Sequence, residues 1–304
     1  MLPSVFPPAS FPAHALLDCG AGEKLERFGD RVLRRPDPQA LWRPRRGPEL
    51  WEAADLVFVR ESDRGGRWEA GARARPGAGD PSGPWQVRYG DATFLLRPTP
   101  FKHVGLFPEQ AANWEFVRAA GELLQAAGVE RPRLLNLFGY TGAASVLARQ
   151  QGWEVTHVDA SKASLGWLRE NLEASGLGDR SVRILCDDAL AFARREVRRG
   201  SRYEAVLLDP PHYGRGPKGE RWQLEEGLAP LVEAVGALLA ERGLLVLSTY
   251  AVGYSPLAFR NLLAELPGGA CSVGELALAE EGAGGRHLPA GFCARWWRGL
   301  ELEG

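Results

Sequence analysis

Short apolar runs alternate with helix-compatible segments from residue 133 onward, and this alternation restricts the fold more than any other feature of the 304-residue chain. The spacing of apolar residues predicts helices over 143–151, 161–175, 189–197, 224–242 and 256–266. Strands are predicted over 133–137, 154–159, 182–186, 205–208 and 244–248. Repeated strand–helix units form a mostly parallel sheet with helices on both faces. We therefore predict an α/β, Rossmann-like sheet that binds ligands at the carboxyl ends of its strands.

The first 100 residues lack this alternation and carry short β-compatible runs separated by turn formers. Proline-rich residues 1–13 predict an extended arm, and residues 60–84 predict a mobile surface loop. Runs over 85–89 and 92–96 predict a hairpin. The sequence thus predicts a small β-rich domain over 1–100, with substrate recognition as a candidate role, and an α/β domain over 101–304. The last two runs of that domain, 272–279 and 290–297, are predicted to pair antiparallel.

Arginine and tryptophan are interleaved in the N-terminal domain. The residues concerned are Arg43, Arg45, Arg46, Arg64, Arg67, Arg73 and Arg75, with Trp42, Trp51 and Trp68. Such a mixture can bind RNA through phosphate contacts and base stacking. It is equally typical of a solvated loop beside a few core tryptophans, and the sequence leaves both interpretations open.

Composition indicates a soluble globular protein, with 45% apolar and 25% charged residues and a net charge of -1. No uncharged apolar run approaches the ~20 residues that span a bilayer, and the N-terminus lacks a signal-peptide pattern, so we expect a cytoplasmic protein. The four cysteines, Cys19, Cys186, Cys271 and Cys293, form no Cys-x-x-Cys pair. This spacing argues against a zinc site or a disulfide scaffold, and we expect no metal.

A glycine-spaced turn, Gly139-Tyr140-Thr141-Gly142, follows the first predicted strand of the α/β domain. Glycine allows close approach of a ligand to the backbone, and the helix that follows offers unpaired N–H groups. Asp159 lies twenty residues beyond Gly139 at the end of the next strand, where an acidic residue meets ribose hydroxyls. A dinucleotide fold shares this geometry but needs a third glycine, which is missing here. The turn favours a nucleoside without a pyrophosphate.

Polar side chains stand at four successive strand ends, namely Asn136, Asp159, Asp187/Asp188 and Asp209. The last begins the sequence Asp209-Pro210-Pro211-His212-Tyr213. Neither proline has an N–H, so this turn presents carbonyl acceptors together with a carboxylate. Such an array can hold an amino group by its hydrogens while the nitrogen lone pair attacks an electrophile.

These motifs resemble the class I S-adenosylmethionine-dependent methyltransferases, and within them the bacterial large-subunit ribosomal RNA base methyltransferases. The resemblance covers residues 101–297 and implies S-adenosylmethionine as cofactor. It places Asp159 at the ribose and Asp187 or Asp188 at the adenine amino group. Asn136 stands where many relatives carry an acidic residue. The cofactor-binding residues expected are Phe107, Gln110, Asn136, Phe138, Gly139, Thr141, Gly142, Asp159, Ala160, Ser161, Asp187, Asp188 and Asp209.

The residue types near the Asp-Pro-Pro turn favour nitrogen as the methylated atom. Carbon-5 methylation of cytosine needs a cysteine thiolate, and neither His212 nor the Ser248-Thr249-Tyr250 stretch supplies one. The expected catalytic residues are Asp209, Pro210, Pro211, His212 and Tyr213. Amine methyltransferases of this kind usually carry an aromatic residue where His212 stands, so His212 can stack, accept a proton or pack. Candidate substrate contacts are Lys102, His103, Arg215, Lys218 and Tyr250.

The leading functional hypothesis is methylation of a base nitrogen, guanine N2 or N7 or another amine, in ribosomal RNA. A protein side-chain amide or a small molecule remains an alternative substrate, because the same turn suits a glutamine amide. A non-catalytic protein that retains the cofactor pocket is a third alternative. The sequence does not determine the oligomeric state.

Overall fold

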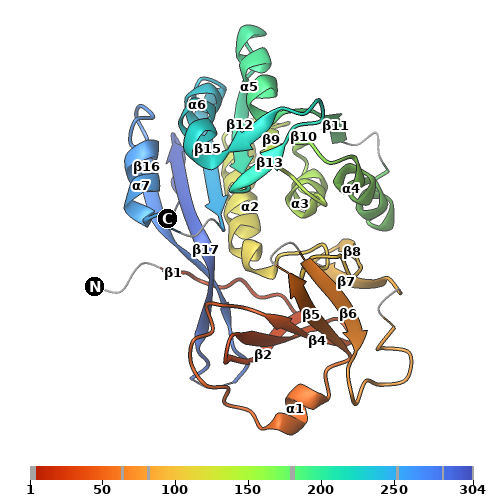
Figure 1. Ribbon diagram of the computed structural model, residues 1–304. Helices are drawn as coiled ribbons and strands as arrows, with labels where there is room; N and C mark the ends of the chain where they lie inside the picture. Colours follow the sequence, from red (N-terminus) through yellow and green to blue (C-terminus); the bar gives the residue numbers. More distant parts are fainter. Residues whose placement is uncertain are drawn as a thin grey trace. The chain divides into compact units, whose positions relative to one another are not determined.

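The computed structural model describes residues 5–62, 65–80, 83–178, 182–250, 253–282 and 284–302. The chain divides into two compact units (Figure 1). The α/β unit contains residues 1–6, 112–276 and 291–304, and the β-rich unit contains residues 7–111 and 277–290. The chain therefore passes between the units more than once. Residues 1–6 belong to the α/β unit although residues 7–111 follow them in the β-rich unit, and residues 277–290 return to the β-rich unit.

The α/β unit is built on an eight-stranded sheet with the order β1-β16-β17-β15-β12-β9-β10-β11. Its strands are β1 (Val5–Phe6), β9 (Arg133–Leu137), β10 (Glu154–Asp159), β11 (Val182–Cys186), β12 (Tyr203–Leu208), β15 (Leu239–Thr249), β16 (Ala270–Ala279) and β17 (His287–Arg298). Strands β15, β12, β9, β10 and β11 pair in parallel, and β17 pairs antiparallel with β15. The predicted fold class is confirmed.

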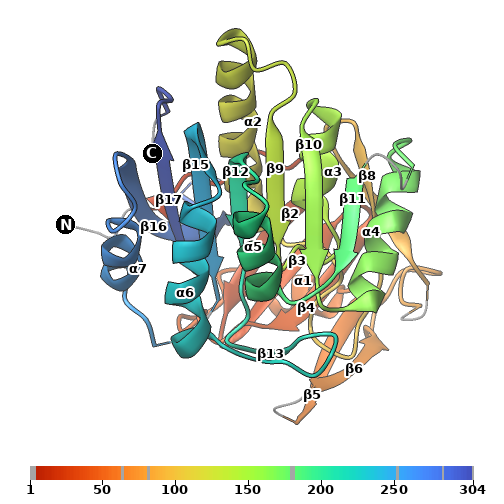
Figure 2. The same cartoon turned by 90° about the horizontal axis from the view of Figure 1, so that it is seen from above.

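Helices precede or connect the strands of this sheet. They are α2 (Ala111–Ala126), α3 (Ala143–Gln150), α4 (Lys162–Ala174), α5 (Ala189–Arg198), α6 (Leu224–Gly236) and α7 (Pro256–Leu263), and a 3-10 turn (Pro108–Gln110) precedes α2. Figure 2 shows the strands side by side, with α5 and α6 passing in front of them. Apolar side chains of these helices, such as Phe192 and Leu231, pack with Leu135 and Val206 of the strands in one buried cluster. Burial of this surface is the main force that holds the sheet and helices together.

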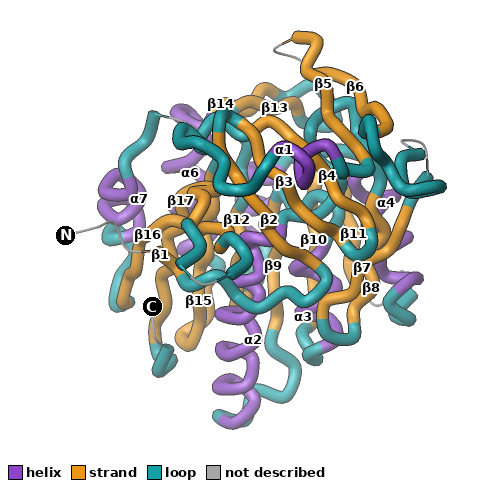
Figure 3. The backbone as a smooth tube through the Cα atoms, turned by 90° about the horizontal axis from the view of Figure 1, so that it is seen from below, coloured by secondary structure: helices purple, strands orange, loops and turns teal. Residues whose placement is uncertain are grey.

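The β-rich unit contains a five-stranded sheet in the order β2-β3-β4-β5-β6 (Figure 3). Its strands are β2 (His14–Gly20), β3 (Glu23–Phe28), β4 (Arg31–Pro36), β5 (Leu56–Ser62) and β6 (Gly65–Ala70), and a short helix α1 (Pro48–Glu52) precedes β5. The predicted hairpin is confirmed as β7 (Trp85–Tyr89) and β8 (Ala92–Leu96).

The predicted surface loop over 60–84 is wrong in part, because β6 lies within it and pairs antiparallel with β5. Trp68 of β6 is buried, and this aromatic side chain fixes the segment. In the sequence, the glycines and arginines around Trp68 suggested a loop instead. Three arginines of this segment form ion pairs: Arg67 with Glu61 and Glu69, Arg73 with Glu52, and Arg75 with Asp55. Arg64 lies outside the described residues. These pairings and the burial of Trp51 favour the structural interpretation of the cluster.

Three further boundaries differ from prediction. The helix predicted over 224–242 ends at Gly236, and Leu239 already pairs with Tyr203 of β12. The helix predicted over 256–266 ends at Leu263. The N-terminal arm includes β1, which pairs in parallel with β16 and buries Phe6. Strand pairing accounts for the first and the third of these differences. Within the described residues, no helix combines the length and apolar character needed to cross a bilayer.

Candidate functional site

The glycine turn links the ends of β9 and β10. The Gly139 N–H donates to the Val158 carbonyl over 3.2 Å, and the Tyr140 N–H donates to the Asp159 carboxylate over 2.8 Å. Phe138 and Tyr140 adopt positive φ values of 56° and 52°, which are rare for residues with bulky side chains. Such backbone strain persists only where the surroundings enforce it, and it clusters at functional sites.

Gly139 and Gly142 are required by the chain's own packing. A Cβ atom on Gly139 would lie 2.2 Å from Cε1 of His157, and one on Gly142 would lie 2.1 Å from Cδ1 of Leu168. Gly142 also has a φ of 81°, which favours glycine. The chain itself therefore needs the space at these two glycines, and their contact with the cofactor stays a prediction. Their missing side chains make room for a buried histidine and a buried leucine.

Gly139→Ala is expected to destabilise the protein by roughly 1–3 kcal/mol, because the new methyl group overpacks a rigid site. Gly166→Ala is the matched control, since Gly166 lies in α4 with nothing within 4 Å of its Cβ position. That change replaces a poor helix former and is expected to stabilise by about 0.5–1 kcal/mol. Urea unfolding measures the free energy of unfolding of both variants, which is expected to fall for Gly139→Ala and to rise for Gly166→Ala. A Gly139→Ala protein as stable as the parent would contradict the packing argument.

Asp159 ends β10 with both carboxylate oxygens engaged. Oδ2 accepts the Tyr140 N–H and Oδ1 accepts the Ser161 N–H, each over 2.8 Å. Burial raises the pKa of this carboxyl group, although both hydrogen bonds favour its charged form. A carboxylate offers about four lone-pair sites, so Asp159 keeps capacity to accept hydrogen bonds from hydroxyl groups.

Asn136 lies inside β9, one residue before its end, and is buried. Its Nδ2 donates to Ser145 Oγ over 3.0 Å, and that oxygen lies 2.9 Å from Nδ1 of His157. Burial lowers the pKa of His157 to about 3, so its imidazole is neutral. Sequence reasoning missed this Asn136–Ser145–His157 chain, although a histidine inside an otherwise apolar strand is a visible signal. A cofactor contact of Asn136 stays a prediction.

The two aspartates after β11 have different partners. Asp188 caps α5 by accepting the Ala191 N–H over 2.8 Å. Asp187 pairs with Arg195 and accepts the Asp188 N–H, while its own N–H donates to the Asp159 carbonyl over 3.2 Å. Asp187 is therefore the aspartate that is linked to Asp159 through the backbone.

The Asp-Pro-Pro turn follows β12 and is braced by a hairpin. The hairpin consists of β13 (Tyr213–Arg215) and β14 (Arg221–Gln223). Buried Trp222 donates from Nε1 to the Pro211 carbonyl over 2.7 Å, and its ring lies 4.9 Å from that of Phe138. Trp222 thus joins the Asp-Pro-Pro turn to the glycine turn. A lone tryptophan in a polar stretch was the signal for it.

Exposed and half-exposed aromatic groups surround His212. Its ring lies 4.5 Å from that of Tyr213, which is 62% exposed, and 6.2 Å from that of Tyr254. His212 Nε2 lies 2.8 Å from Oε1 of Glu225, the second residue of α6. Glu225 and Tyr254 were missed from the sequence because neither belongs to a motif.

The remaining predicted residues fall into both units. Thr141 is buried, and Ser161 caps α4, next to Ala160. Arg215 and Lys218 are exposed in the β13–β14 hairpin, and Tyr250 follows β15. The predicted residues in the β-rich unit are Lys102, His103, Phe107 and Gln110. Their cofactor and substrate roles stay predictions.

Burial determines the state of two predicted residues in the β-rich unit. It lowers the pKa of Lys102 to about 8, and Lys102 Nζ donates to the Pro36 carbonyl over 3.2 Å. It lowers the pKa of His103 to about 3, and the ring of His103 lies 5.0 Å from that of Phe107. His103 is therefore neutral at physiological pH.

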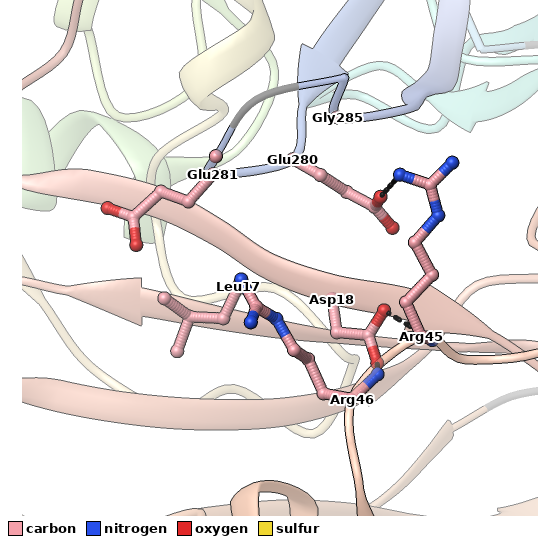
Figure 4. Close-up of a pocket in the computed structure, with 8 residues that line it drawn as sticks. Leu17, Asp18, Arg45, Arg46, Glu280, Glu281 and Gly285 are labelled. Atoms are coloured by element: carbon pink, nitrogen blue, oxygen red, sulfur yellow. Dashed lines mark hydrogen bonds and ion pairs between the residues drawn. The ribbon is translucent and has the colours of Figure 1, made fainter.

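A polar pocket of about 250 Å³ lies elsewhere in the β-rich unit (Figure 4). Asp18 in its wall accepts the backbone N–H groups of Arg45 and Arg46 over 3.1 and 2.9 Å. Arg45 donates to the Gly284 carbonyl over 2.8 Å, and Arg286 pairs with Glu280 over 2.6 Å. These groups satisfy one another. Arg45 and Arg46 belong to the arginine and tryptophan cluster noted in the sequence, whereas none of the expected catalytic, cofactor-binding or substrate-contact residues is among the described residues that line this pocket.

The chain is similar to one family model and to solved methyltransferase structures. Residues 115–247 match the family model described as "Conserved hypothetical protein 95". A solved S-adenosylmethionine-dependent methyltransferase from Agrobacterium tumefaciens is 38% identical, with a TM-score of 0.89. That match covers 98% of this chain and 94% of the other.

Curated relatives match over a shorter stretch. Ribosomal RNA large subunit methyltransferase K/L of Syntrophotalea carbinolica is 31% identical over 166 residues, and that of Methylococcus capsulatus is 34% identical over 165. Each match covers 54% of this chain but only 22% and 21% of the relatives, about a fifth of their length. The near full-length likeness to the Agrobacterium protein shows that this chain belongs to the S-adenosylmethionine-dependent methyltransferases, whose cofactor is S-adenosylmethionine.

Proposed function

We propose that the protein transfers a methyl group from S-adenosylmethionine to a base nitrogen of ribosomal RNA. The observation that carries the proposal is the Asp209-Pro210-Pro211-His212 turn at the carboxyl end of β12, joined through Trp222 to the glycine turn. Parallel sheets bind their ligands at these strand ends. The names of the curated relatives support RNA as the substrate.

The residues around the glycine turn fit the cofactor by their chemistry. Asp159 is half-buried, accepts two backbone N–H groups and has lone pairs left for ribose hydroxyls. Asp187, linked to Asp159 through the backbone, provides a carboxylate suited to an adenine amino group. When bound, S-adenosylmethionine supplies a methyl group made electrophilic by the positive sulfur.

The Asp-Pro-Pro turn orients the methyl acceptor. The Asp209 carboxylate and the Pro210 carbonyl accept hydrogen bonds from an amine, which directs the nitrogen lone pair away from these oxygens. Such alignment supplies most of the rate enhancement in a displacement that needs no metal. Exposed Tyr213 offers a ring on which a base can stack, and Arg215, Lys218 and Arg221 on the same hairpin offer positive charge to phosphates.

Asp159→Asn is expected to raise the dissociation constant of S-adenosylmethionine by about 10- to 100-fold. The amide keeps one acceptor oxygen and turns a donor toward the backbone N–H groups, so hydrogen bonds to a charged group, worth about 1.5–3 kcal/mol, are lost. Isothermal titration calorimetry measures the change. Glu173→Gln, on the exposed face of α4, is the charge-matched control and is expected to bind normally. Unchanged affinity of the Asp159→Asn protein would contradict the assigned cofactor site.

Methyl transfer from labelled cofactor to RNA, protein and metabolite fractions tests the substrate. Label in large-subunit ribosomal RNA, transcribed in vitro and therefore unmodified, is the expected result. Label only in protein or metabolites would overturn the RNA proposal and favour an amide or small-molecule acceptor. Tight cofactor binding without transfer to any fraction would overturn catalysis itself.

A further inference from the structure

His212 is held by a carboxylate from a different element. Its Nε2 lies 2.8 Å from Oε1 of Glu225, which stands in the first turn of α6. The backbone reinforces this approach, because the Leu224 N–H donates to the His212 carbonyl over 3.0 Å. Tyr254, shortly before α7, also hydrogen-bonds to the Glu225 carboxylate. Two donors from separate segments thus converge on one acceptor.

The ionisation states of these partners determine the histidine tautomer. The hydrogen bonds from His212 and Tyr254 lower the pKa of Glu225 to about 2, and the same contact raises the pKa of Tyr254 to about 12. Glu225 is therefore a carboxylate at neutral pH and can only accept hydrogen bonds. A neutral His212 must then carry its proton on Nε2, which leaves a lone pair on Nδ1. Within the described part of the chain, Nδ1 of His212 has no hydrogen-bond partner.

We propose that Glu225, supported by Tyr254, is a positioning residue that presents Nδ1 of His212 as the proton acceptor of the methyl-transfer site. This inference rests on the proposed function, because it takes the Asp209 turn as the acceptor site. It narrows the acceptor to a nitrogen that carries hydrogen, such as an exocyclic amine, since a ring nitrogen without hydrogen has no proton to lose.

The step balances in atoms and charge. The lone pair of the amine nitrogen forms the new bond to the methyl carbon while the carbon–sulfur bond breaks, and that electron pair stays on sulfur. The nitrogen, now positive, releases one proton to Nδ1 of His212. The resulting imidazolium lies against the Glu225 carboxylate, which stabilises its charge. The Tyr213 ring lies beside that of His212, with the ring centroids 4.5 Å apart and the ring planes tilted by 33°.

The test compares Glu225→Gln with Glu226→Gln. Glu226 is the next residue of α6 and is exposed, so this control removes the same charge from the same helix turn without touching His212. Glu225→Gln is expected to lower kcat about tenfold on in-vitro transcribed large-subunit ribosomal RNA, as part of the roughly 10²–10⁴-fold that general base catalysis provides. The cofactor dissociation constant is expected to stay within about twofold. Glu226→Gln is expected to match the parent in both.

Two readouts separate positioning from mere structural support. Nitrogen-15 NMR of the histidine side chains is expected to show the Nε2–H tautomer of His212 in the parent and a mixture in Glu225→Gln. The acidic limb of the pH–rate profile is expected to move to lower pH in Glu225→Gln, because the imidazolium loses its carboxylate neighbour. The other titratable groups near His212, namely Asp209, Tyr213 and Tyr254, are unchanged in this variant.

The possible outcomes each decide the matter. Parental kcat and an unmoved pH profile in Glu225→Gln overturn the inference, as does an Nδ1–H tautomer in the parent protein. A parent enzyme that transfers no methyl group overturns the proposed function as well, whereas an active parent with an unaffected Glu225→Gln overturns only the inference. A reduced kcat with a shifted acidic limb and an intact cofactor affinity supports it.

Discussion

Asp209→Asn is expected to lower the methyl-transfer rate by about 10²–10³-fold, the usual loss when one preorganised polar group is removed from a catalytic site. Asp209 follows β12 directly, between buried Leu208 and buried Pro210, so its backbone position is fixed by the strand and by the proline ring. Asparagine keeps the shape of the side chain, but its amide nitrogen is a hydrogen-bond donor. It would face the amine that accepts the methyl group, which is also a hydrogen-bond donor. Initial rates with labelled cofactor measure the loss.

The cofactor affinity of Asp209→Asn is expected to stay near the parent value, because the ribose and adenine contacts are assigned to Asp159 and Asp187. Asp91→Asn provides the control, since Asp91 is an exposed aspartate in the β7–β8 turn. Asp209→Ala is expected to behave like Asp209→Asn, which separates loss of the carboxylate from an effect of the new amide. An Asp209→Asn enzyme with more than a third of the parental rate would contradict the assignment of Asp209 to catalysis.

The α/β half of the fold could be predicted because its strands are buried on both faces and read as uninterrupted apolar runs. The helix starts were equally visible. Ser161 accepts the Ser164 N–H and Asp188 accepts the Ala191 N–H, as their positions before apolar-periodic segments predict. The helix ends were less visible. The alanine and leucine residues after Gly236 suit a helix, but Ala237 caps α6 and Leu239 already begins β15 by pairing with Tyr203.

The side chains at the strand ends of the candidate site could be predicted from the sequence. The residues that contact them could not. A strand order fixes where Asp159 and Asp209 end up, because carboxyl ends of parallel strands share one edge. The partners Glu225 and Trp222 come from later segments that fold back, and no local pattern encodes that contact. The reason for glycine at positions 139 and 142 could not be predicted from the local sequence either. The side chains that exclude a Cβ atom there, His157 and Leu168, come from other elements.

Glu26→Gln is expected to destabilise the β-rich unit by about 3–5 kcal/mol, the usual cost of breaking a buried ion pair by removing one partner. Glu26 is fully buried in β3, and its Oε2 accepts two hydrogen bonds from Arg35 over 2.9 and 2.5 Å. Its carboxylate also lies 3.6 Å from Lys24 Nζ and 3.1 Å from His14 Nε2. Glutamine would leave the buried Arg35 guanidinium without its counter-charge. Thermal and urea unfolding measure the loss.

The same carboxylate predicts an acid-labile fold. Burial alone raises the pKa of Glu26, but the charges of Arg35 and Lys24 and the hydrogen bond from His14 outweigh it and hold that pKa well below 4.5. A group whose pKa is depressed by folding stabilises the protein fully above its unfolded pKa and loses that contribution as the pH falls through its folded value. The parent is therefore expected to lose stability progressively below about pH 4.5, whereas Glu26→Gln lacks this part of the dependence.

Glu23→Gln is the matched control, because Glu23 lies on the same strand and pairs with Arg34 over 2.6 Å while both side chains are about one-third exposed. A solvent-screened pair contributes only about 0.2–1 kcal/mol, so this variant is expected to unfold near the parental midpoint. A Glu26→Gln protein that matches Glu23→Gln in stability and in acid sensitivity would show that Arg35 finds another partner. The Lys102 carbonyl, which accepts from Arg35 Nη1 over 3.0 Å, is neutral and cannot supply the missing charge.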